Sequence, residues 1–388
     1  MSADPSQNLT ITAQCLCKAH SYSTSISRSS LPFQGSICHC RSCRHVTGAM
    51  YTSHIKWPGL TREILSSNLA RYEFSSNVSL LFCETCSSPL FWEEYYKDKP
   101  ELLDVFTGAL DNATVKNLIT FPDQIFVGDT EDGGLSQWLL NVNEDGIEAR
   151  RWKARAIKSE TFDHDRPALV GASNDDLQSP RDILIQCRCK GVDLVLRRSP
   201  DDFSPAESSS LPFFVDPTTH RHLATFDACN TCRSVFGAEI VNWTFALLRQ
   251  MHHASDTEQP GFPQSVQELQ KAISSPDRDA RLGTLSLYKS SPDVQRYFCS
   301  RCSASVFYAV DDRPDLVDVA VGLLDAPEGA RAERDLIWNM GSRVGGEDDV
   351  VGGWREGFVN RVKETAEKWR VDRGYPKTWR RLAAEKSA

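Results

Sequence analysis

Cys38-His39-Cys40-Arg41-Ser42-Cys43 is the central stretch of a cysteine pattern that occurs twice in this sequence of 388 residues. The two copies together contain all 13 cysteines. The first copy has seven of them, in the order Cys15, Cys17, Cys38, Cys40, Cys43, Cys83 and Cys86. In the second copy an aspartate replaces the third cysteine, and the order is Cys187, Cys189, Asp227, Cys229, Cys232, Cys299 and Cys302. Two thiolates one or two residues apart can reach one tetrahedral ion, so these pairs predict zinc sites.

The repeat extends beyond the cysteines. Three further blocks of sequence recur in the same order. Residues 14–18 resemble 186–190, residues 40–49 resemble 229–238, and residues 103–111 resemble 317–325. Several independent blocks predict two homologous domains. We place the domains and their connections at 10–160 for the first zinc domain, 161–181 for a linker, 182–360 for the second zinc domain and 361–388 for a basic tail.

The composition, 40% hydrophobic and 25% charged, is that of a globular protein. No apolar run approaches the ~20 residues of a membrane span, and residues 1–14 lack a secretory signal pattern. We therefore expect a cytoplasmic protein without a membrane partner, whose reduced thiols favour metal over disulfides. The net charge of −8 argues against a nucleic-acid partner. The tail carries nine basic and four acidic residues, which is typical of a solvated helix; a docking segment is the alternative.

The sequence predicts a mainly β fold with a few short helices. Strand-length apolar runs lie between turn signals, at residues 79–82, 89–92, 103–106, 182–185 and 305–308. Helical spacing occurs at residues 266–273, and a second helix is expected over 357–369. No regular alternation of strands and helices is visible, which disfavours a parallel α/β sheet.

The middle cluster differs between the copies, whereas the outer pairs are intact in both. We therefore group the outer pairs as closed structural sites with four thiolates each, formed by Cys15, Cys17, Cys83 and Cys86 in the first copy and by Cys187, Cys189, Cys299 and Cys302 in the second. Each site would close a long loop, where a metal crosslink restricts the unfolded chain most. Buried thiols without metal are the alternative.

Cys38, Cys40 and Cys43 then form a three-thiolate site with one open position, as in catalytic zinc sites. Such zinc can bind a small thiol or activate water. Asp227, Cys229 and Cys232 are a harder ligand set, less suited to a soft sulfur ligand. This second cluster either binds metal weakly or has lost it. We expect about three zinc ions per chain, or four if Asp227 is a ligand.

The combined pattern resembles the glutathione-dependent formaldehyde-activating enzyme family, which includes centromere protein V. The matching features are Cys15 and Cys17, the stretch Cys38-His39-Cys40-x-x-Cys43-Arg44 with Gly48 and Ala49, the run Phe82-Cys83-x-x-Cys86, and Gly108, Leu110 and Asp111. The resemblance covers residues 14–155 and, less completely, 182–358.

This resemblance implies two tandem domains of the β-tent fold, each with two zinc ions divided as above. It also implies a carbon–sulfur lyase that acts on a thiol adduct of the S-hydroxymethyl-glutathione type, so that glutathione or another small thiol is the expected partner. The second copy departs from the family with Asp227, Ser234 and Phe236 in place of Cys38, His45 and Thr47. The glycine usual after the distal pair is Ser87 or Ser303 here, which suggests an altered turn.

Other residues near the first open cluster have two interpretations each. Arg44 either pairs with a substrate carboxylate or offsets thiolate charge. His45 and Thr47 lie within one turn of the cluster and either transfer protons or support the structure. For His39, between two ligands, a structural or surface role is the alternative to catalysis.

Two other functions are compatible with the sequence. One is a non-catalytic, zinc-stabilised binding protein. The other is an enzyme that acts on a carbonyl or thioether compound unrelated to glutathione.

Overall fold

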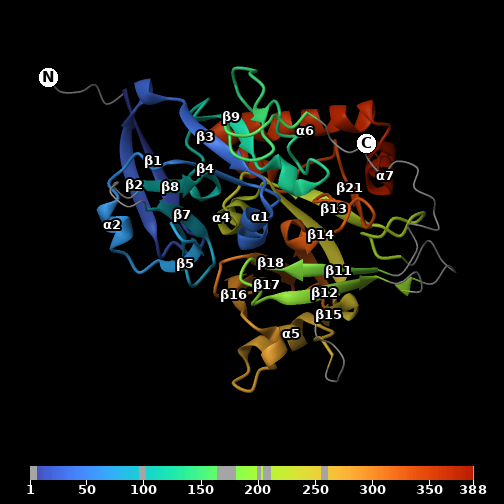
Figure 1. The fold of residues 1–388 in the computed structure, drawn as a ribbon. Coiled ribbons are helices and arrows are strands. Elements are labelled where there is room, and N and C mark those ends of the chain that lie inside the picture. The colour runs from blue at the N-terminus through green and yellow to red at the C-terminus, as the bar shows by residue number, and fades with distance from the viewer. Residues whose placement is uncertain are drawn as a thin grey trace.

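The computed structural model describes residues 7–95, 102–163, 181–198, 202–203, 211–254 and 261–387. Its strands form several sheets, which confirms the mainly β prediction (Figure 1). The predicted linker at 161–181 lies almost entirely outside the described residues. No helix in the part of the chain that the structure describes is long and apolar enough to cross a membrane.

The first half contains a two-stranded and an eight-stranded sheet. The hairpin pairs β1 (Asn8–Gln14) with β2 (Ser21–Ser27). The large sheet has the order β10-β9-β3-β4-β8-β7-β6-β5. Its strands are β3 (Phe33–Cys38), β4 (Thr52–Lys56), β5 (Ala70–Ser75), β6 (Val78–Phe82), β7 (Pro89–Glu94), β8 (Leu102–Phe106), β9 (Ile119–Ile125) and β10 (Arg150–Arg151).

The second half contains a four-stranded sheet, β15-β12-β11-β20, and a seven-stranded sheet, β16-β17-β18-β19-β14-β13-β21. The smaller sheet is made of β11 (Arg181–Gln186), β12 (Asp193–Arg198), β15 (Met251–His253) and β20 (Leu324–Asp325). The larger sheet is made of β13 (His222–Asp227), β14 (Val241–Leu247), β16 (Leu285–Ser291), β17 (Val294–Cys299), β18 (Ser305–Val310), β19 (Leu316–Ala320) and β21 (Leu336–Trp338).

The two large sheets share one topology. In sheet order, β5, β6, β7, β8, β4, β3 and β9 correspond to β16, β17, β18, β19, β14, β13 and β21, and consecutive strands of each series are neighbours. The last pair is parallel in each sheet, whereas the others are antiparallel. This agreement is what a repeat requires; that the halves are homologous domains stays a prediction.

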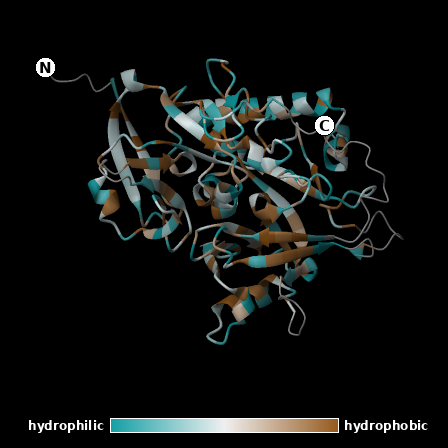
Figure 2. Cartoon of the chain, in the orientation of Figure 1, coloured by the Kyte–Doolittle hydropathy of each residue, from teal (hydrophilic) through white to brown (hydrophobic). Residues whose placement is uncertain are grey.

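The strands hold most of the apolar core, while loops and the outer faces of helices are more hydrophilic (Figure 2). All five predicted strand runs lie within strands β6, β7, β8, β11 and β18. The two predicted helices are α5 (Val266–Ser274) and α6 (Trp354–Asp372). The sequence did not predict α1 (Arg41–Thr47), α2 (Arg62–Leu65), α4 (Asn230–Phe236) or α7 (Trp379–Ser387).

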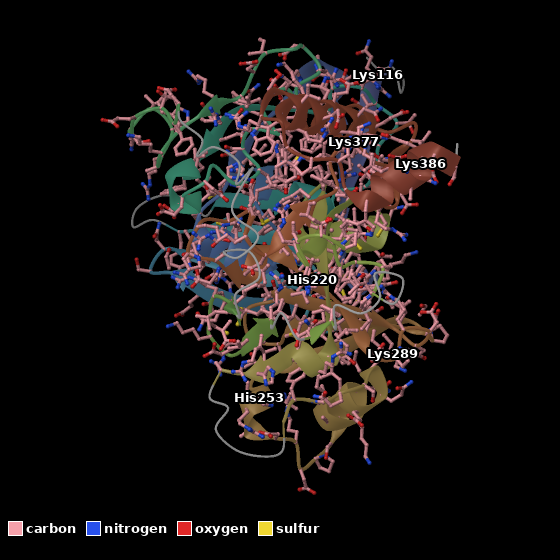
Figure 3. All side chains as sticks on the ribbon, turned by 90° about the vertical axis from the view of Figure 1, so that its right-hand side faces the viewer. Lys116, His220, His253, Lys289, Lys377 and Lys386 are labelled. Atoms are coloured by element: carbon pink, nitrogen blue, oxygen red, sulfur yellow. The ribbon has the colours of Figure 1, made fainter. Side chains whose placement is uncertain are left out.

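The tail is more deeply packed than a solvated helix, so that interpretation is wrong for α6. Residue 361 falls inside this helix, and Val362, Ala366 and Trp369 are buried. The Trp369 ring contacts Trp138 of the first half, with centroids 5.5 Å apart. Ion pairs engage most of the basic tail side chains, namely Arg361, Lys363, Lys368, Arg370, Lys377 and Arg381. Lys377 and Lys386 lie at the α7 end of the molecule (Figure 3).

The halves meet through reciprocal backbone contacts near α1 and α4, at the centre of the molecule (Figure 1). The Gly108 amide donates to the Gly237 carbonyl at 3.2 Å, and the Gly322 amide donates to the Gly48 carbonyl at 3.0 Å. Gly48 and Gly237 end α1 and α4, both with positive φ. Each half thus supports the helix of the other in the same way, as in an isologous interface.

Glycine is required at these contacts because the backbones touch. A Cβ on Gly108 would lie 2.2 Å from the Ala238 nitrogen, and one on Gly322 would lie 2.2 Å from the Ala49 oxygen. We therefore expect Gly108→Ala or Gly322→Ala to lower the free energy of unfolding, at the upper end of the about 1–3 kcal/mol typical of overpacking. Thermal melts measure this. Gly261→Ala, with nothing within 4 Å of its Cβ, is the control, and a Gly108→Ala melt equal to it would contradict the interface.

Candidate metal centres

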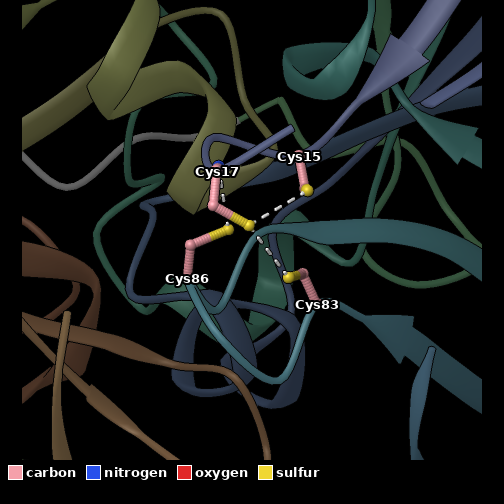
Figure 4. Close-up of side chains that lie close together, drawn as sticks. All are labelled: Cys15, Cys17, Cys83 and Cys86. Carbon is pink, nitrogen blue, oxygen red and sulfur yellow. Dashed lines mark hydrogen bonds between the residues drawn. The ribbon is translucent and has the colours of Figure 1, made fainter. Parts of the chain in front are cut away.

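The structure brings together Cys15, Cys17, Cys83 and Cys86, the first predicted closed site (Figure 4). Cys15 and Cys17 follow β1, and the other two follow β6. All four Sγ atoms lie within 4.8 Å of one another, with 3.6 Å between Cys15 and Cys17 and 3.5 Å between Cys17 and Cys83. Four sulfurs around tetrahedral zinc, at about 2.3 Å from the metal, would be about 3.8 Å apart. The spacing therefore fits zinc.

Backbone amides support the same thiols. The His20 amide donates to Cys15 Sγ at 3.3 Å, and the Cys17 amide donates to Cys86 Sγ at 3.5 Å. Such donors favour the thiolate form, which is the form that binds metal. This cluster therefore has both the spacing and the polar support of a closed zinc site.

The second outer cluster, Cys187, Cys189, Cys299 and Cys302, has the same form. Its sulfurs are separated by 3.5 Å between Cys187 and Cys189 and by 3.4 Å between Cys189 and Cys299. The Val192 amide donates to Cys187 Sγ at 3.2 Å. Both halves thus place a four-thiol cluster between the ends of two strands.

The serines that follow the distal pairs both adopt a positive φ. Ser87 has φ 62° and Ser303 has φ 68°, in the left-handed region that favours glycine. The expectation that the serines alter the turn stays a prediction. The Ser87 amide still donates to the Cys83 carbonyl at 2.9 Å, and the Ser303 amide donates to the Cys299 carbonyl at 3.0 Å.

Cys38, Cys40 and Cys43 form a separate cluster of three thiols. Cys38 ends β3, Cys40 caps α1, and the Cys43 amide donates to Cys40 Sγ at 3.2 Å. The hydrogen bond with Cys38 lowers the pKa of Cys40 to about 3, while the hydrogen bond with Cys40 raises the pKa of Cys38. Without a cation, one thiolate is thus stabilised by two thiols. All three become thiolates only beside a positive charge, which a metal supplies.

His39 is not part of this cluster. It is fully buried, and its Nε2 lies 2.8 Å from Gln124 Oε1. Gln124 Nε2 donates to the carbonyls of Ser136 and Leu139 at 3.1 Å each, which leaves Oε1 as the acceptor and His39 Nε2 as the donor. Burial lowers the pKa of His39 to about 4. These contacts favour a structural role for His39.

Thr47 has a local structural role as well. Its Oγ1 donates to the Cys43 carbonyl at 3.0 Å and accepts from the Ala49 amide at 3.2 Å, so it ties the last turn of α1 together. Arg44 is 4% exposed, and burial lowers its pKa. Its charge lies near the thiols, and its pairing with a substrate carboxylate stays a prediction.

His45 is in a different position from its neighbours. It is 5% exposed, and burial, followed by the charges of Arg44, Arg41 and Arg188, lowers its pKa to about 3. The imidazole is therefore neutral at physiological pH, and three cations surround it. Its Nε2 is buried without a hydrogen-bond partner among the described residues.

The second middle cluster contains an arginine that the sequence analysis missed. Asp227, Cys229 and Cys232 lie together, but Asp227 Oδ1 accepts from the Cys229 amide at 2.8 Å. The Arg296 guanidinium lies 3.8 Å from Cys232 Sγ and donates to Thr231 Oγ1 at 2.7 Å. Arg296 is 6% exposed. A fixed organic cation therefore lies against a thiol that would otherwise bind metal.

The first half has Leu80 in the place of Arg296. Both residues come three positions before the first cysteine of the distal pair, and both face a tyrosine in the neighbouring strand, Tyr72 or Tyr288. The signal in the sequence was an arginine within the otherwise apolar end of a strand run. The position of this arginine beside the cluster depends on the register of β17 against β16, which the sequence does not reveal.

Zinc content and stability should separate the closed from the open cluster. Cys83→Ser removes a ligand that joins β1 to β6, so it should lower the melting temperature strongly by removing part of the several kcal/mol that structural zinc contributes to folding. Cys40→Ser should keep the wild-type melt but lose one zinc per chain, from about three to about two, by elemental analysis. Equal melts for both variants would contradict the division of ligands.

Arg296 and Asp227 together should exclude zinc from the second middle cluster. We expect the double variant Asp227→Cys, Arg296→Leu, which reproduces the first half's residues, to bind about four zinc ions per chain. Asp227→Cys alone should stay near three, because the guanidinium still opposes a second cation. Elemental analysis of the three proteins tests this, and a wild-type value near four would overturn it.

The family description "Glutathione-dependent formaldehyde-activating enzyme" matches residues 10–129, which include the first closed cluster and the Cys38–Cys43 cluster. The second half lies outside this match. No curated protein and no solved structure matches the chain. Over residues 10–129, the chain is therefore similar to the glutathione-dependent formaldehyde-activating enzyme family.

Proposed function

We propose that the first half of the chain acts on a small thiol or thiol adduct, making or breaking a carbon–sulfur bond at Cys38, Cys40 and Cys43. The observation that carries this proposal is the ligand count. Three thiols form this group, and no histidine, aspartate, glutamate or fourth cysteine of the described residues belongs to it. The nearest histidine in sequence, His39, is bonded to Gln124. A metal held there keeps a position for a ligand from outside the protein.

The three cysteines determine which kind of ligand the open metal position would favour. Three soft thiolates favour a soft fourth ligand such as sulfur. Zinc, when bound by this set, supplies a positive charge that lowers the pKa of a thiol beside it. Cys38 is 6% exposed and Cys43 is 7% exposed, so the site is shielded from bulk water and charge interactions there are strong. The proposed substrate is an S-hydroxymethyl adduct of glutathione or of another small thiol.

The second half supports this proposal as a scaffold without equivalent chemistry. Arg296 lies against Cys232, and Asp227 bonds to its own loop. The same half retains its closed cluster and the Gly322 contact to the end of α1. We therefore assign the thiol chemistry to the first half alone.

Cobalt substitution tests the proposed function. Addition of a small thiol to the cobalt form should strengthen the thiolate charge-transfer and tetrahedral d–d bands, because the cluster gains a fourth sulfur ligand. Cys38→Asp converts the cluster to the ligand types of the second half and should abolish most of this response. The closed clusters serve as the internal control, since their four positions are filled. A wild-type spectrum that ignores thiols would favour the non-catalytic, zinc-stabilised binding protein instead.

A further inference from the structure

A cleft of about 230 Å³ lies where the first turns of α1 meet the cysteine loop of the second half. It belongs to both halves of the chain, being lined by Arg41, Ser42, His45, Gln186, Cys187, Arg188 and Lys190. The Arg188 amide donates to the His45 carbonyl at 2.7 Å, which fixes the two walls against each other. The cleft is therefore part of the packed interface between the halves.

The charged side chains of the cleft are all basic. Three of its seven lining residues are Arg41, Arg188 and Lys190, and none is acidic. Arg41 pairs with Asp325 outside the lining. Arg188 and Lys190 are exposed and form no ion pair with any residue that the structure describes. The Arg188 guanidinium lies over the Phe74 ring, 5.7 Å from its centroid, and this contact limits its freedom.

His45 adds a polar group to the same wall. It is 5% exposed, lines the cleft, and its buried Nε2 has no hydrogen-bond partner within the described ranges. An unpaired buried nitrogen is costly unless something bonds to it. A ligand oxygen in the cleft would lie among arginine, lysine and imidazole nitrogens.

The cleft adjoins the Cys38–Cys43 cluster, and only one of its three cations, Lys190, has a basic counterpart in the other half, which is Lys18. Arg41 and Ser42 lie between the ligands Cys40 and Cys43. In the other half, the residues that correspond to Arg41, His45 and Arg188 are Asn230, Ser234 and Leu16. The basic cleft therefore accompanies the cluster with three cysteines, and the second half supplies two of its three cations.

We propose that this cleft binds the anionic group, a carboxylate or a phosphate, of the thiol compound whose sulfur reaches Cys38, Cys40 and Cys43. Arg188 is the principal contact, because its planar guanidinium can bind two oxygens of either anion, and Lys190 adds a point charge. The inference rests on the proposed function and deepens it. It names an anionic thiol as the substrate class and assigns substrate recognition to the second half.

Titrations of the cobalt form with matched thiols test the cleft. Pantetheine 4′-phosphate and pantetheine differ only by a phosphate, and glutathione and its diethyl ester differ by their free carboxylates. The wild type should bind at least one anionic thiol about tenfold more tightly than its neutral partner, and the preferred pair identifies the anion. Arg188→Leu, the residue found at the equivalent Leu16, should remove this preference and leave the neutral thiols unchanged. Lys289→Gln, on strand β16 (Figure 3) and outside the residues that line the cleft, is the charge-matched control.

Two results would contradict anion binding in the cleft. One is equal binding of charged and neutral thiols by the wild type, and the other is an Arg188→Leu variant that binds both classes equally more weakly. If no thiol changes the cobalt spectrum, the proposed function fails separately. Calorimetry with S-methylglutathione and with pantethine 4′,4″-bisphosphate, which lack a free thiol, then tests anion binding by the cleft independently of the cysteine cluster. If the wild type binds either compound and the Arg188→Leu variant does not, the result supports anion binding in the cleft. If the wild type binds neither compound, anion binding in the cleft is refuted.

Discussion

A group of buried thiolates needs a cation, and this constraint distinguishes the four cysteine clusters of the chain. Thiolates a few ångströms apart repel one another, and burial makes the repulsion stronger. Four thiols at tetrahedral spacing provide a complete ligand set for a divalent metal. Three thiols provide an incomplete set. The cluster with only two thiols has Arg296 beside it. The type of cation each cluster can accept therefore follows from the number of cysteines and the nearest basic side chain.

The same constraint links the clusters to the fold. The closed cluster of each half joins the hairpin at the start of that half to the distal strand pair of its large sheet, from β1 to β6 and from β11 to β17. Without metal, these strand ends would be held only by hydrogen bonds and by apolar contacts. A closed cluster is consequently a folding element, whereas the middle cluster sits at the start of α1, which also rests on Gly322 of the other half. For this reason we expect the fold to tolerate loss of metal from a middle cluster.

Much of the architecture could be predicted from the sequence, since its signals are local. Paired cysteines, apolar runs bounded by turns and the helical spacing of Val266, Leu269 and Ile273 each act over a few residues, and the mainly β fold followed from them. Arg296 and Arg188 could not be assigned in this way. The first acquires its role through the register of β17 beside β16, and the second through the packing of one half on the other. The burial of α6 was missed for the same reason, because Trp369 finds its partner Trp138 far away in sequence.

The role of Gly108 shows why a motif can be recognised before it is understood. In the sequence it is one member of a pattern with Leu110 and Asp111, close to no cysteine. In the structure it allows the backbone to touch Gly237 at the end of α4, while Gly322 does the same for Gly48 at the end of α1. The second half, whose middle cluster has Asp227 and Arg296 where the first half has Cys38 and Leu80, therefore still positions the α1 helix that carries Cys43. Arg188, in place of the leucine of the first half, lies in the cysteine loop of the second half and lines the cleft beside α1.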